Sequence, residues 1–351
     1  MTQFIGVAEM AKLVRATGIE SFLKKLAAAI EEDFIRWPLF DKMARIATHS
    51  ANGVIELMPT SDGRFYGFKY VNGHPGNPRT GKLTVTAFGV LSDVDSGYPL
   101  LIAEMTLLTA LRTAATSAMA ARTLARRGSH VLALVGAGAQ SEFQALAMKA
   151  LVGVDTVRIY DPDPAAIDKF MHNAAGFDLK LVRAPSVGEA VRGADIVTTA
   201  TAVKGRAAVI TPEMIRPGMH SNAIGGDCPG KTELHAGVLR LGQVFVEFPA
   251  QTRIEGEIQQ MPADFAVTEL WDVLSGNRPG RAADADITIF DSVGFAIEDF
   301  AALRLVRDLS RRTGKDLDLI PDLDDPKDLF GPLLGEDKPA PSPSIFAEML
   351  A

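Results

Sequence analysis

The pattern of hydrophobic and polar positions divides the chain into two parts of different character. Residues 20–36 place apolar side chains at helical spacing, and Pro38 ends this pattern. Between residues 44 and 104, short segments with strand character are separated by turn signals such as Asn52-Gly53 and Asn72-Gly73. The first part of the chain is therefore predicted to contain a helix followed by an antiparallel sheet of several strands.

The second part begins with a long helix, predicted over residues 106–127, which are rich in Ala, Leu and Arg and are followed by Gly128. After it, apolar strand segments alternate with helical segments, and the last long helix is predicted over residues 295–312. Such alternation is typical of parallel strands joined by crossover helices. The fold class indicated is α/β, with a Rossmann-type domain after an N-terminal α+β domain that contains the antiparallel sheet.

Composition and charge narrow the range of functions. The 351 residues are 47% hydrophobic and 23% charged, which is ordinary for a globular protein. A net charge of −7 argues against nucleic acid or an anionic membrane as the main partner. No apolar run reaches the ~18 residues needed to span a bilayer, and the N-terminus has no signal-peptide pattern. The single cysteine, Cys228, fits a reducing compartment, so we expect a cytoplasmic protein; no cluster has metal-ligand spacing, so we expect no metal.

A glycine turn indicates a dinucleotide site. Gly136 and Gly138 directly follow the apolar strand VLALV and open a helix, although Ser141 stands where the fingerprint has Gly or Ala. The second strand ends at Asp161, where an acid can accept hydrogen bonds from ribose hydroxyls and repel a 2′-phosphate. This arrangement predicts NAD rather than NADP. The alternative is a glycine turn used only for packing, with Asp161 as a solvated strand end.

Three further segments are hard to explain as scaffold. Arg45 precedes the strand segment with Glu56, and Lys69 lies in FKYVNGHP. The turn Gly225-Gly226-Asp227 directly follows a predicted parallel strand, where α/β proteins bind ligands. The alternatives are solvated charges for Arg45 and Lys69, an outward-facing strand residue for Glu56, and a turn-stabilising role for Asp227.

The motifs VIELMP, FKYVNGHP, DVDSGYP, ALRTAATS, GGDCPGKTELH and EGEIQQ resemble those of the ornithine cyclodeaminase and μ-crystallin family. The resemblance covers about residues 2–330 and is strongest to the bacterial ornithine cyclodeaminases. It implies a substrate-binding and dimerisation domain over residues 1–115, completed by 316–351, and a Rossmann NAD-binding domain over 116–315. It also implies a homodimer that joins the two N-terminal sheets.

The resemblance implies the conversion of L-ornithine to L-proline and ammonia. In the family reaction, hydride passes from the substrate α-carbon to NAD and gives an imine. The distal amine attacks this carbon, ammonia leaves, and the cyclic imine takes the hydride back. The cofactor is therefore used catalytically, with no net redox change.

The resemblance also implies roles for individual residues. Asp227 corresponds to the catalytic acid–base, and Arg45, Lys69 and Arg112 correspond to the cations that bind the substrate carboxylate. Glu56 is an acceptor for the distal ammonium, and Met58 in the same motif borders the substrate. The residues expected to contact NAD are Thr84, Arg112, Gly136, Gly138, Ala139, Gln140, Asp161, Thr201, Lys231 and Ser292.

Other functions are compatible with the same motifs. A lysine cyclodeaminase would differ by one methylene of substrate, which a pocket discriminates by only ~1–3 kcal/mol. A net NAD-dependent amino acid dehydrogenase or a cyclic imine reductase would keep the fold and change the reaction. A non-catalytic ligand-binding or lens-type protein is the alternative outside enzymes. The presence of Asp227 together with Arg45, Lys69 and Arg112 argues against that last class.

Overall fold

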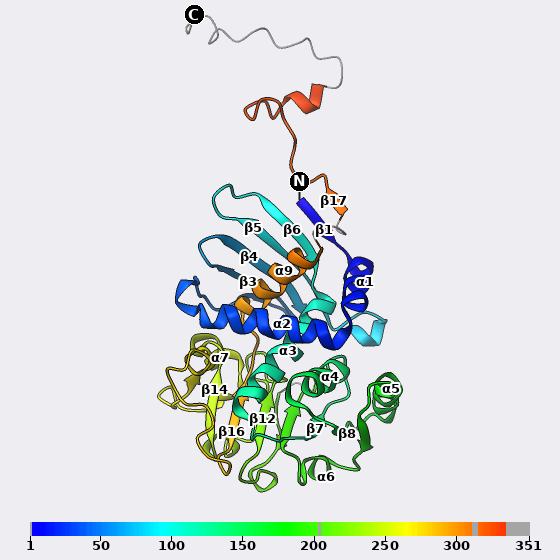
Figure 1. Ribbon diagram of the computed structural model, residues 1–351, viewed down its shortest axis with the longest axis vertical. Helices are drawn as coiled ribbons and strands as arrows, with labels where there is room; N and C mark the ends of the chain where they lie inside the picture. Colours follow the sequence, from blue (N-terminus) through cyan, green and yellow to red (C-terminus); the bar gives the residue numbers. More distant parts are fainter. Residues whose placement is uncertain (1, 203–204, 311–314, 335–351) are drawn as a thin grey trace, which may run out of the picture.

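The computed structural model describes residues 2–202, 205–310 and 315–334, and it arranges them in two layered units (Figure 1). The Pro-rich tail that the sequence predicts to be mobile, residues 335–351, lies outside the described residues. Among the described residues, no helix has the length and apolar character needed to cross a membrane.

The first unit is built on a seven-stranded sheet in the order β17-β1-β6-β5-β4-β3-β2. Strands β2 to β6 pair as an antiparallel meander, whereas β1 joins β6 in parallel and β17 pairs antiparallel with β1. The predicted antiparallel sheet is therefore confirmed. The strand bounds are β1 (Thr2–Ile5), β2 (Ile46–His49), β3 (Val54–Ser61), β4 (Phe65–Gly73), β5 (Val85–Asp93), β6 (Pro99–Glu104) and β17 (Lys315–Leu317).

Helices cover one face of this sheet (Figure 1). Helix α2 (Ile19–Ile35) is the helix predicted over residues 20–36, and it buries one apolar stripe that includes Phe22, Leu26 and Ile30. Helix α1 (Val7–Thr17), which precedes it, was not predicted. Helix α9 (Ala296–Ser310) packs on α2 and on strands β3, β4 and β5.

The position of α9 corrects the predicted domain boundary. The Rossmann domain predicted from the sequence extends to residue 315, but α9 lies on the antiparallel sheet (Figure 1). The chain therefore returns to the first unit at about residue 296, directly after β16 (Thr288–Asp291). The helical pattern of α9 shows that one face is buried, and it does not show which sheet buries it.

The second unit is an eight-stranded sheet in the order β15-β14-β16-β12-β10-β7-β8-β9, in which every pairing is parallel. This confirms the Rossmann-type fold. The remaining strands of this sheet are β7 (Val131–Val135), β8 (Thr156–Tyr160), β9 (Lys180–Arg183), β10 (Ile196–Thr199), β12 (His220–Ala223), β14 (Gln243–Val246) and β15 (Thr268–Glu269). A separate two-stranded sheet pairs β11 (Arg206–Ile210) with β13 (Thr232–Leu234). The helices of this unit are α4 (Ser141–Val152), α5 (Pro164–Ala174), α6 (Val187–Val191), α7 (Pro249–Glu255) and α8 (Leu270–Leu274). Short 3₁₀ helices are η1 (Trp37–Leu39), η2 (Asn77–Thr80), η3 (Pro212–Met214), η4 (Val238–Arg240), η5 (Glu257–Gln260) and η6 (Gly331–Leu334).

Helix α3 (Thr106–Leu124) joins the two units, since it contacts α2 and β5 of the first and α4, β12 and β16 of the second. The predicted boundary at residue 115 therefore falls inside a continuous helix. The helix ends at Leu124, earlier than the predicted residue 127. The carbonyl of Leu124 accepts hydrogen bonds from Arg281 Nε (2.8 Å) and Thr288 Oγ1 (2.9 Å), so tertiary partners satisfy it in place of another helical turn.

Candidate active site

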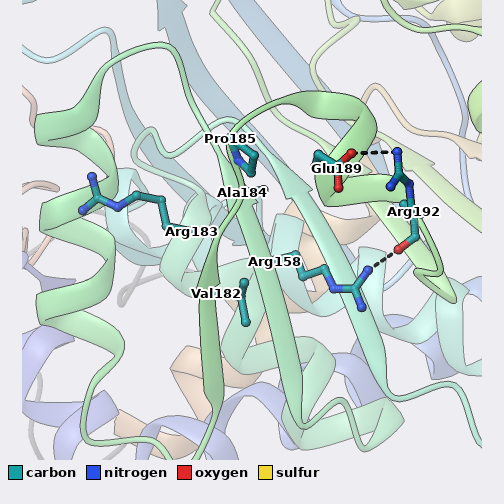
Figure 2. Close-up of a pocket in the computed structure, with 7 residues that line it drawn as sticks. All are labelled: Arg158, Val182, Arg183, Ala184, Pro185, Glu189 and Arg192. Carbon is teal, nitrogen blue, oxygen red and sulfur yellow. Dashed lines mark hydrogen bonds and ion pairs between the residues drawn. The ribbon is translucent and has the colours of Figure 1, made fainter.

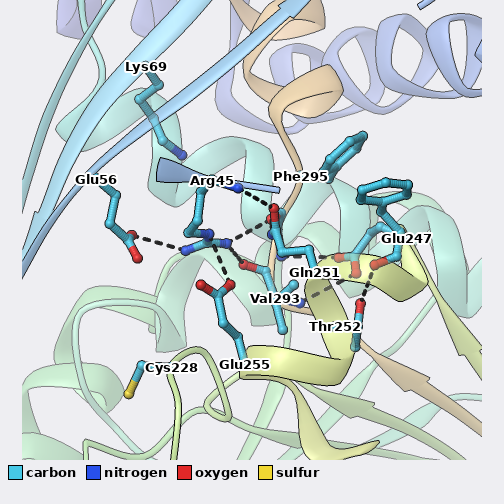
Figure 3. A network of polar contacts seen from close by, with 12 residues as sticks. Arg45, Glu56, Lys69, Cys228, Glu247, Gln251, Thr252, Glu255, Val293 and Phe295 are labelled. Atoms are coloured by element: carbon cyan, nitrogen blue, oxygen red, sulfur yellow. Dashed lines mark hydrogen bonds and ion pairs between the residues drawn. The ribbon is translucent and has the colours of Figure 1, made fainter. Parts of the chain in front are cut away.

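The candidate site lies where the carboxyl ends of the Rossmann strands face the first unit. Parallel strands present these ends at one edge of a sheet, and ligands of such folds bind there. Contacts across the boundary are direct. The backbone N–H of Arg45 donates to Gln251 Oε1 (3.1 Å), and Arg45 Nη2 donates to the carbonyls of Val293 (2.6 Å) and Gly294 (2.9 Å) (Figure 3).

The glycine turn after β7 has the form of a dinucleotide cradle. Gly136 has φ +108°, and a Cβ there would lie 2.5 Å from the carbonyl oxygen of Ala200, so the position excludes other residues. Gly138 is exposed, and no atom lies within 4 Å of where its Cβ would be. Ser141 at the third fingerprint position fixes the turn, because its Oγ donates to the carbonyl of Gly138 (2.7 Å). Ala139 and Gln140 complete the turn at the N-terminus of α4.

Asp161 lies at the end of β8, beside this turn. Its Oδ2 accepts a hydrogen bond from Ala137 N (2.7 Å), and its Oδ1 accepts one from Asp163 N (2.8 Å). Each carboxylate oxygen has a second lone pair, so both can also accept from a ribose hydroxyl. The open approach at Gly138, the helix N-terminus and this acid together fit a bound dinucleotide.

Arg45 is the centre of a buried charge cluster (Figure 3). Its Nη1 lies 3.1 Å from Glu56 Oε2, and its Nε lies 3.0 Å from Glu255 Oε2 of α7. All three side chains are at most 7% exposed. Glu56 therefore faces inward and is not an outward-facing strand residue. Met58, two residues further along β3, is on the same buried face.

Lys69 and Arg112 form a second cluster with two carboxylates of α9. Lys69 Nζ lies 2.8 Å from Asp299, and Arg112 contacts Asp299 through Nε (2.9 Å) and Glu298 through Nη1 (2.6 Å). Burial, reinforced by the charge of Arg112, lowers the pKa of Lys69 to about 8 against the opposing effect of Asp299. Burial raises the pKa of Glu298. Among the described residues, Arg112 Nη2 has no hydrogen-bond partner, so this cluster retains donors for a further anion.

Asp227 is the exposed acid of the site. Its side chain is 54% exposed, and its Oδ1 lies 3.2 Å from Lys231 Nζ. The charge of Asp227 acts on Arg45 and on Glu255, so this carboxylate lies near the first cluster. The neighbouring Cys228 is a free, half-buried thiol, and burial raises its pKa, so it lacks the thiolate character of a nucleophile.

Two other residues predicted to contact the cofactor donate hydrogen bonds to buried carboxylates. Thr201 donates through N (2.7 Å) and Oγ1 (2.5 Å) to Glu233, and Ser292 Oγ donates to Glu247 (2.5 Å). Thr84 lies in the segment between β4 and β5, where its carbonyl accepts from His74 N (2.8 Å). The structure thus places Thr201 and Ser292 at strand ends of the Rossmann edge and leaves Thr84 on the first unit.

Comparison with known proteins agrees with this geometry. Residues 7–314 match the family model described as "Ornithine cyclodeaminase/mu-crystallin family". The chain belongs to the ornithine cyclodeaminase/μ-crystallin family. It is 61% identical to ornithine cyclodeaminase of Agrobacterium fabrum over 94% of both chains. It is 59% identical to ornithine cyclodeaminase of Brucella suis over 95% of this chain and 94% of that one.

Solved structures of the same family are similar over nearly the whole chain. A lysine cyclodeaminase studied for recognition of L-lysine, L-ornithine and L-2,4-diaminobutyric acid has a TM-score of 0.84 and 30% identity, covering 93% of this chain and 98% of that one. An archaeal alanine dehydrogenase dimer with bound NAD has a TM-score of 0.83 and 30% identity, covering 91% and 99% of the two chains. These relatives have the same fold and are named for different reactions. The fold alone therefore does not identify the reaction, and the residues of the site have to be considered.

Four buried carboxylates of this site are not among the residues predicted from the sequence, namely Glu247, Glu255, Glu298 and Asp299. Charged residues are rarely buried without partners, and in a sequence they are hard to distinguish from surface charges. Glu255 had one available signal, since it belongs to the family motif EGEIQQ. Glu298 and Asp299 had none, because their role depends on α9 returning to the first sheet.

A separate surface cavity of about 350 Å³ lies along β8, β9 and α6 (Figure 2). Its polar side chains are already paired, since Arg158 donates to the carbonyl of Arg192, and Arg192 pairs with Glu189 (2.7 Å). Arg183 points away from the other arginines and pairs with Asp168 (Figure 2). None of the predicted site residues lines this cavity.

The glycine turn generates a prediction in which two similar substitutions have different effects. Gly136→Ala places a side chain against Ala200 at a left-handed φ, so it should lower the free energy of unfolding by at least ~1–3 kcal/mol. Gly138→Ala has space in the free protein, so it should leave stability unchanged and weaken binding of the dinucleotide. Denaturant unfolding and titration with NAD measure the two effects. Equal NAD affinity of Gly138→Ala and parent would contradict this location of the pyrophosphate.

Proposed function

We propose that the protein converts L-ornithine to L-proline and ammonia, with NAD as a bound catalytic cofactor. The observation that carries the proposal is the 61% identity, over 94% of both chains, with a protein named ornithine cyclodeaminase. The site supports it, because an amino acid with a second amine needs cations at one end and carboxylates at the other. We also place the enzyme in the cytoplasm, where Cys228 would remain a thiol.

The residues of the Rossmann edge suit NAD, which when bound accepts a hydride from the substrate α-carbon and returns it to the cyclic imine. We infer that Gly138, Ala139 and Gln140 hold the pyrophosphate at the N-terminus of α4 and that Asp161 holds the adenosine ribose. Further contacts are assigned to Thr84, Arg112, Gly136, Thr201, Lys231 and Ser292.

The two charge clusters fit the two ends of ornithine. Arg112 and Lys69 retain N–H groups that can donate to a further anion, so we assign them to the substrate carboxylate. Arg45 has its Nη2 occupied by two carbonyls and its Nε paired with Glu255, which leaves one Nη1 proton for the substrate. Its larger contribution is to hold Glu56 and Glu255 side by side.

Two carboxylates, Glu56 and Glu255, contact the single positive charge of Arg45, and Asp227, which pairs with Lys231, acts on that charge from further away. This excess of negative charge favours the distal ammonium of a diamino acid over an apolar side chain. Met58 lies on the same buried strand face and supplies an apolar border. Asp227 is the most exposed of the three acids, so it is assigned to exchange protons with the substrate amines.

One assay separates the proposed reaction from the alternatives of the same fold. Protein and NAD are incubated with ornithine, lysine or alanine, and proline, pipecolate, ammonia and NADH are measured. The proposal expects proline and ammonia in equal amounts from ornithine without accumulating NADH. Faster formation of pipecolate from lysine, or NADH rising with ammonia, would instead identify a lysine cyclodeaminase or a net dehydrogenase.

Asp227→Asn tests the acid–base assignment. Asparagine has nearly the same shape and cannot exchange protons at the amines, so kcat should fall by ~10²–10⁴-fold while folding and NAD binding are retained. The matched control is Asp264→Asn, which changes an exposed acid outside the site and should keep parental kcat. A folded Asp227→Asn protein with near-parental kcat would mean that Asp227 only stabilises its turn.

Glu255→Gln tests recognition of the distal ammonium. Burial and the charges of Glu56 and Asp227 raise the pKa of Glu255 to about 7 against the opposing effect of Arg45. The acid is therefore ionised above pH 7 and neutral below it, so the KM for ornithine should rise as pH falls through 7. In Glu255→Gln the KM should be raised ~10-fold or more at pH 8 and should no longer depend on pH in this range.

Norvaline is the control ligand, because it is ornithine without the distal amine. Its inhibition constant should change little in Glu255→Gln or between pH 6 and 8. If norvaline and ornithine weakened equally, Glu255 would act only by supporting Arg45.

The outer face of the first sheet supports a homodimer. Side chains of four adjacent strands form one apolar row, because the register pairs Ile46 with Leu57, Leu57 with Tyr70, and Tyr70 with Phe88. Ile46, Leu57 and Phe88 are 60%, 41% and 44% exposed. A contiguous apolar face of this kind is typical of a protein–protein interface. We infer that it pairs with the same face of a second copy.

Leu57→Lys should weaken this dimer, because it places a charge in the centre of the row. Light scattering after size exclusion should show a concentration-dependent shift toward monomer. Leu241→Lys is the matched control, since Leu241 is similarly exposed (43%) and lies on the Rossmann unit. A parent protein that is monomeric at all concentrations would refute the dimer.

A further inference from the structure

Three buried carboxylates are stacked beneath the turn Gly225-Gly226-Asp227. They are Asp291 at the end of β16, Glu257 in η5 and Glu233 in β13, and each is at most 1% exposed. Asp291 Oδ1 accepts from Glu257 N (2.8 Å), and Glu257 Oε1 accepts from Glu233 N (2.7 Å). Each carboxylate therefore fixes the backbone of the residue that carries the next one.

The last carboxylate of this series joins two loops of the Rossmann edge. Glu233 Oε1 accepts both hydrogen bonds of Thr201, which follows β10. A Cβ added to Gly225 would overlap both carboxylate oxygens of Glu233, and one added to Gly226 would lie 2.6 Å from Glu257 Oε1. The two glycines are therefore required by close packing on the carboxylates beneath them.

Asp227 has few contacts of its own that could fix its position. Its side chain is 54% exposed, and among the described residues its one ion pair is with Lys231. The turn that carries it is supported from below by Glu233 and Glu257. On its far side, Gly230 N donates to Gln259 Oε1 (2.6 Å). The position of Asp227 relative to the Rossmann sheet therefore depends on the carboxylates on which the turn packs.

We propose that Glu233 is a positioning residue, which ties the Thr201 loop to the Gly225-Gly226 turn and thereby sets Asp227 in place. This inference rests on the proposed function, in which Asp227 exchanges protons with the substrate amines. A displacement of about 1 Å in a reacting group can cost ~10²-fold in rate, so a support beneath the turn has catalytic consequences.

Glu233 acts through its shape, which fills the space beneath Gly225, and through the hydrogen bonds that it accepts from Thr201. Burial raises its pKa, against the opposing effect of the hydrogen bonds from Thr201. A glutamine has the same length and keeps an acceptor toward Thr201. Glu233→Gln should therefore retain most of the activity, whereas Glu233→Ala removes both the hydrogen bonds and the support.

The test is a double-mutant cycle between Glu233 and Gly225, measured as kcat at saturating NAD and ornithine. Glu233→Ala should lower kcat by ~10–100-fold, and Gly225→Ala alone should also lower it, because its methyl group overlaps the Glu233 carboxylate. The double variant has room for that methyl group, so it should be more active than Gly225→Ala alone. Gly188→Ala is the matched control and should be parental, since no atom lies within 4 Å of its added Cβ.

Hydrogen exchange provides a readout that does not require the proposed reaction. In Glu233→Ala, amides of residues 199–201 and 225–231 should exchange faster than in the parent, while those of Glu233→Gln should not. Unchanged exchange in Glu233→Ala, parental kcat of Gly225→Ala, or a double variant no better than Gly225→Ala would each overturn the inference. A parent protein that forms no proline would refute the proposed function, and the exchange data would still decide whether Glu233 joins the two loops.

Discussion

The ion pairs of Arg45 are the interaction on which the site depends most. This guanidinium belongs to the first unit, and it pairs with Glu56 of the same unit and with Glu255 of the Rossmann unit. All three groups are buried, so replacing Arg45 would leave Glu56 and Glu255 without a compensating charge, which typically costs ~3–5 kcal/mol. The same contact therefore joins the two units and brings the first sheet over the edge where Asp227 lies.

The other cations of the site depend on the return of the chain to the first unit. Helix α9 supplies Glu298 and Asp299, and these carboxylates hold Lys69 and Arg112 in place. The segment just before it supplies the carbonyls of Val293 and Gly294 that accept from Arg45. One crossing of the chain between the units thus orients every cation that we assign to the substrate.

Periodicity and turn signals predicted the two sheets and most of the helices, because they report which residues face a core. They did not predict the partner of α9, since a helical stripe does not identify the surface that covers it. Motifs located Arg45, Lys69, Arg112 and Asp227. The burial of the carboxylates was not predicted. Glu233 and Glu255 lie within the motifs GGDCPGKTELH and EGEIQQ, but a motif does not show which of its acids face the interior.

The fate of the hydrogen on C2 of ornithine tests the central claim most directly. If the hydride that leaves C2 returns to C2 of the cyclic imine within one closed site, ornithine deuterated at C2 should give proline that retains the deuterium. Ammonia should appear mole for mole with proline, and NADH should not accumulate. Proline that has lost the label to water, or NADH released in proportion to ammonia, would contradict the account.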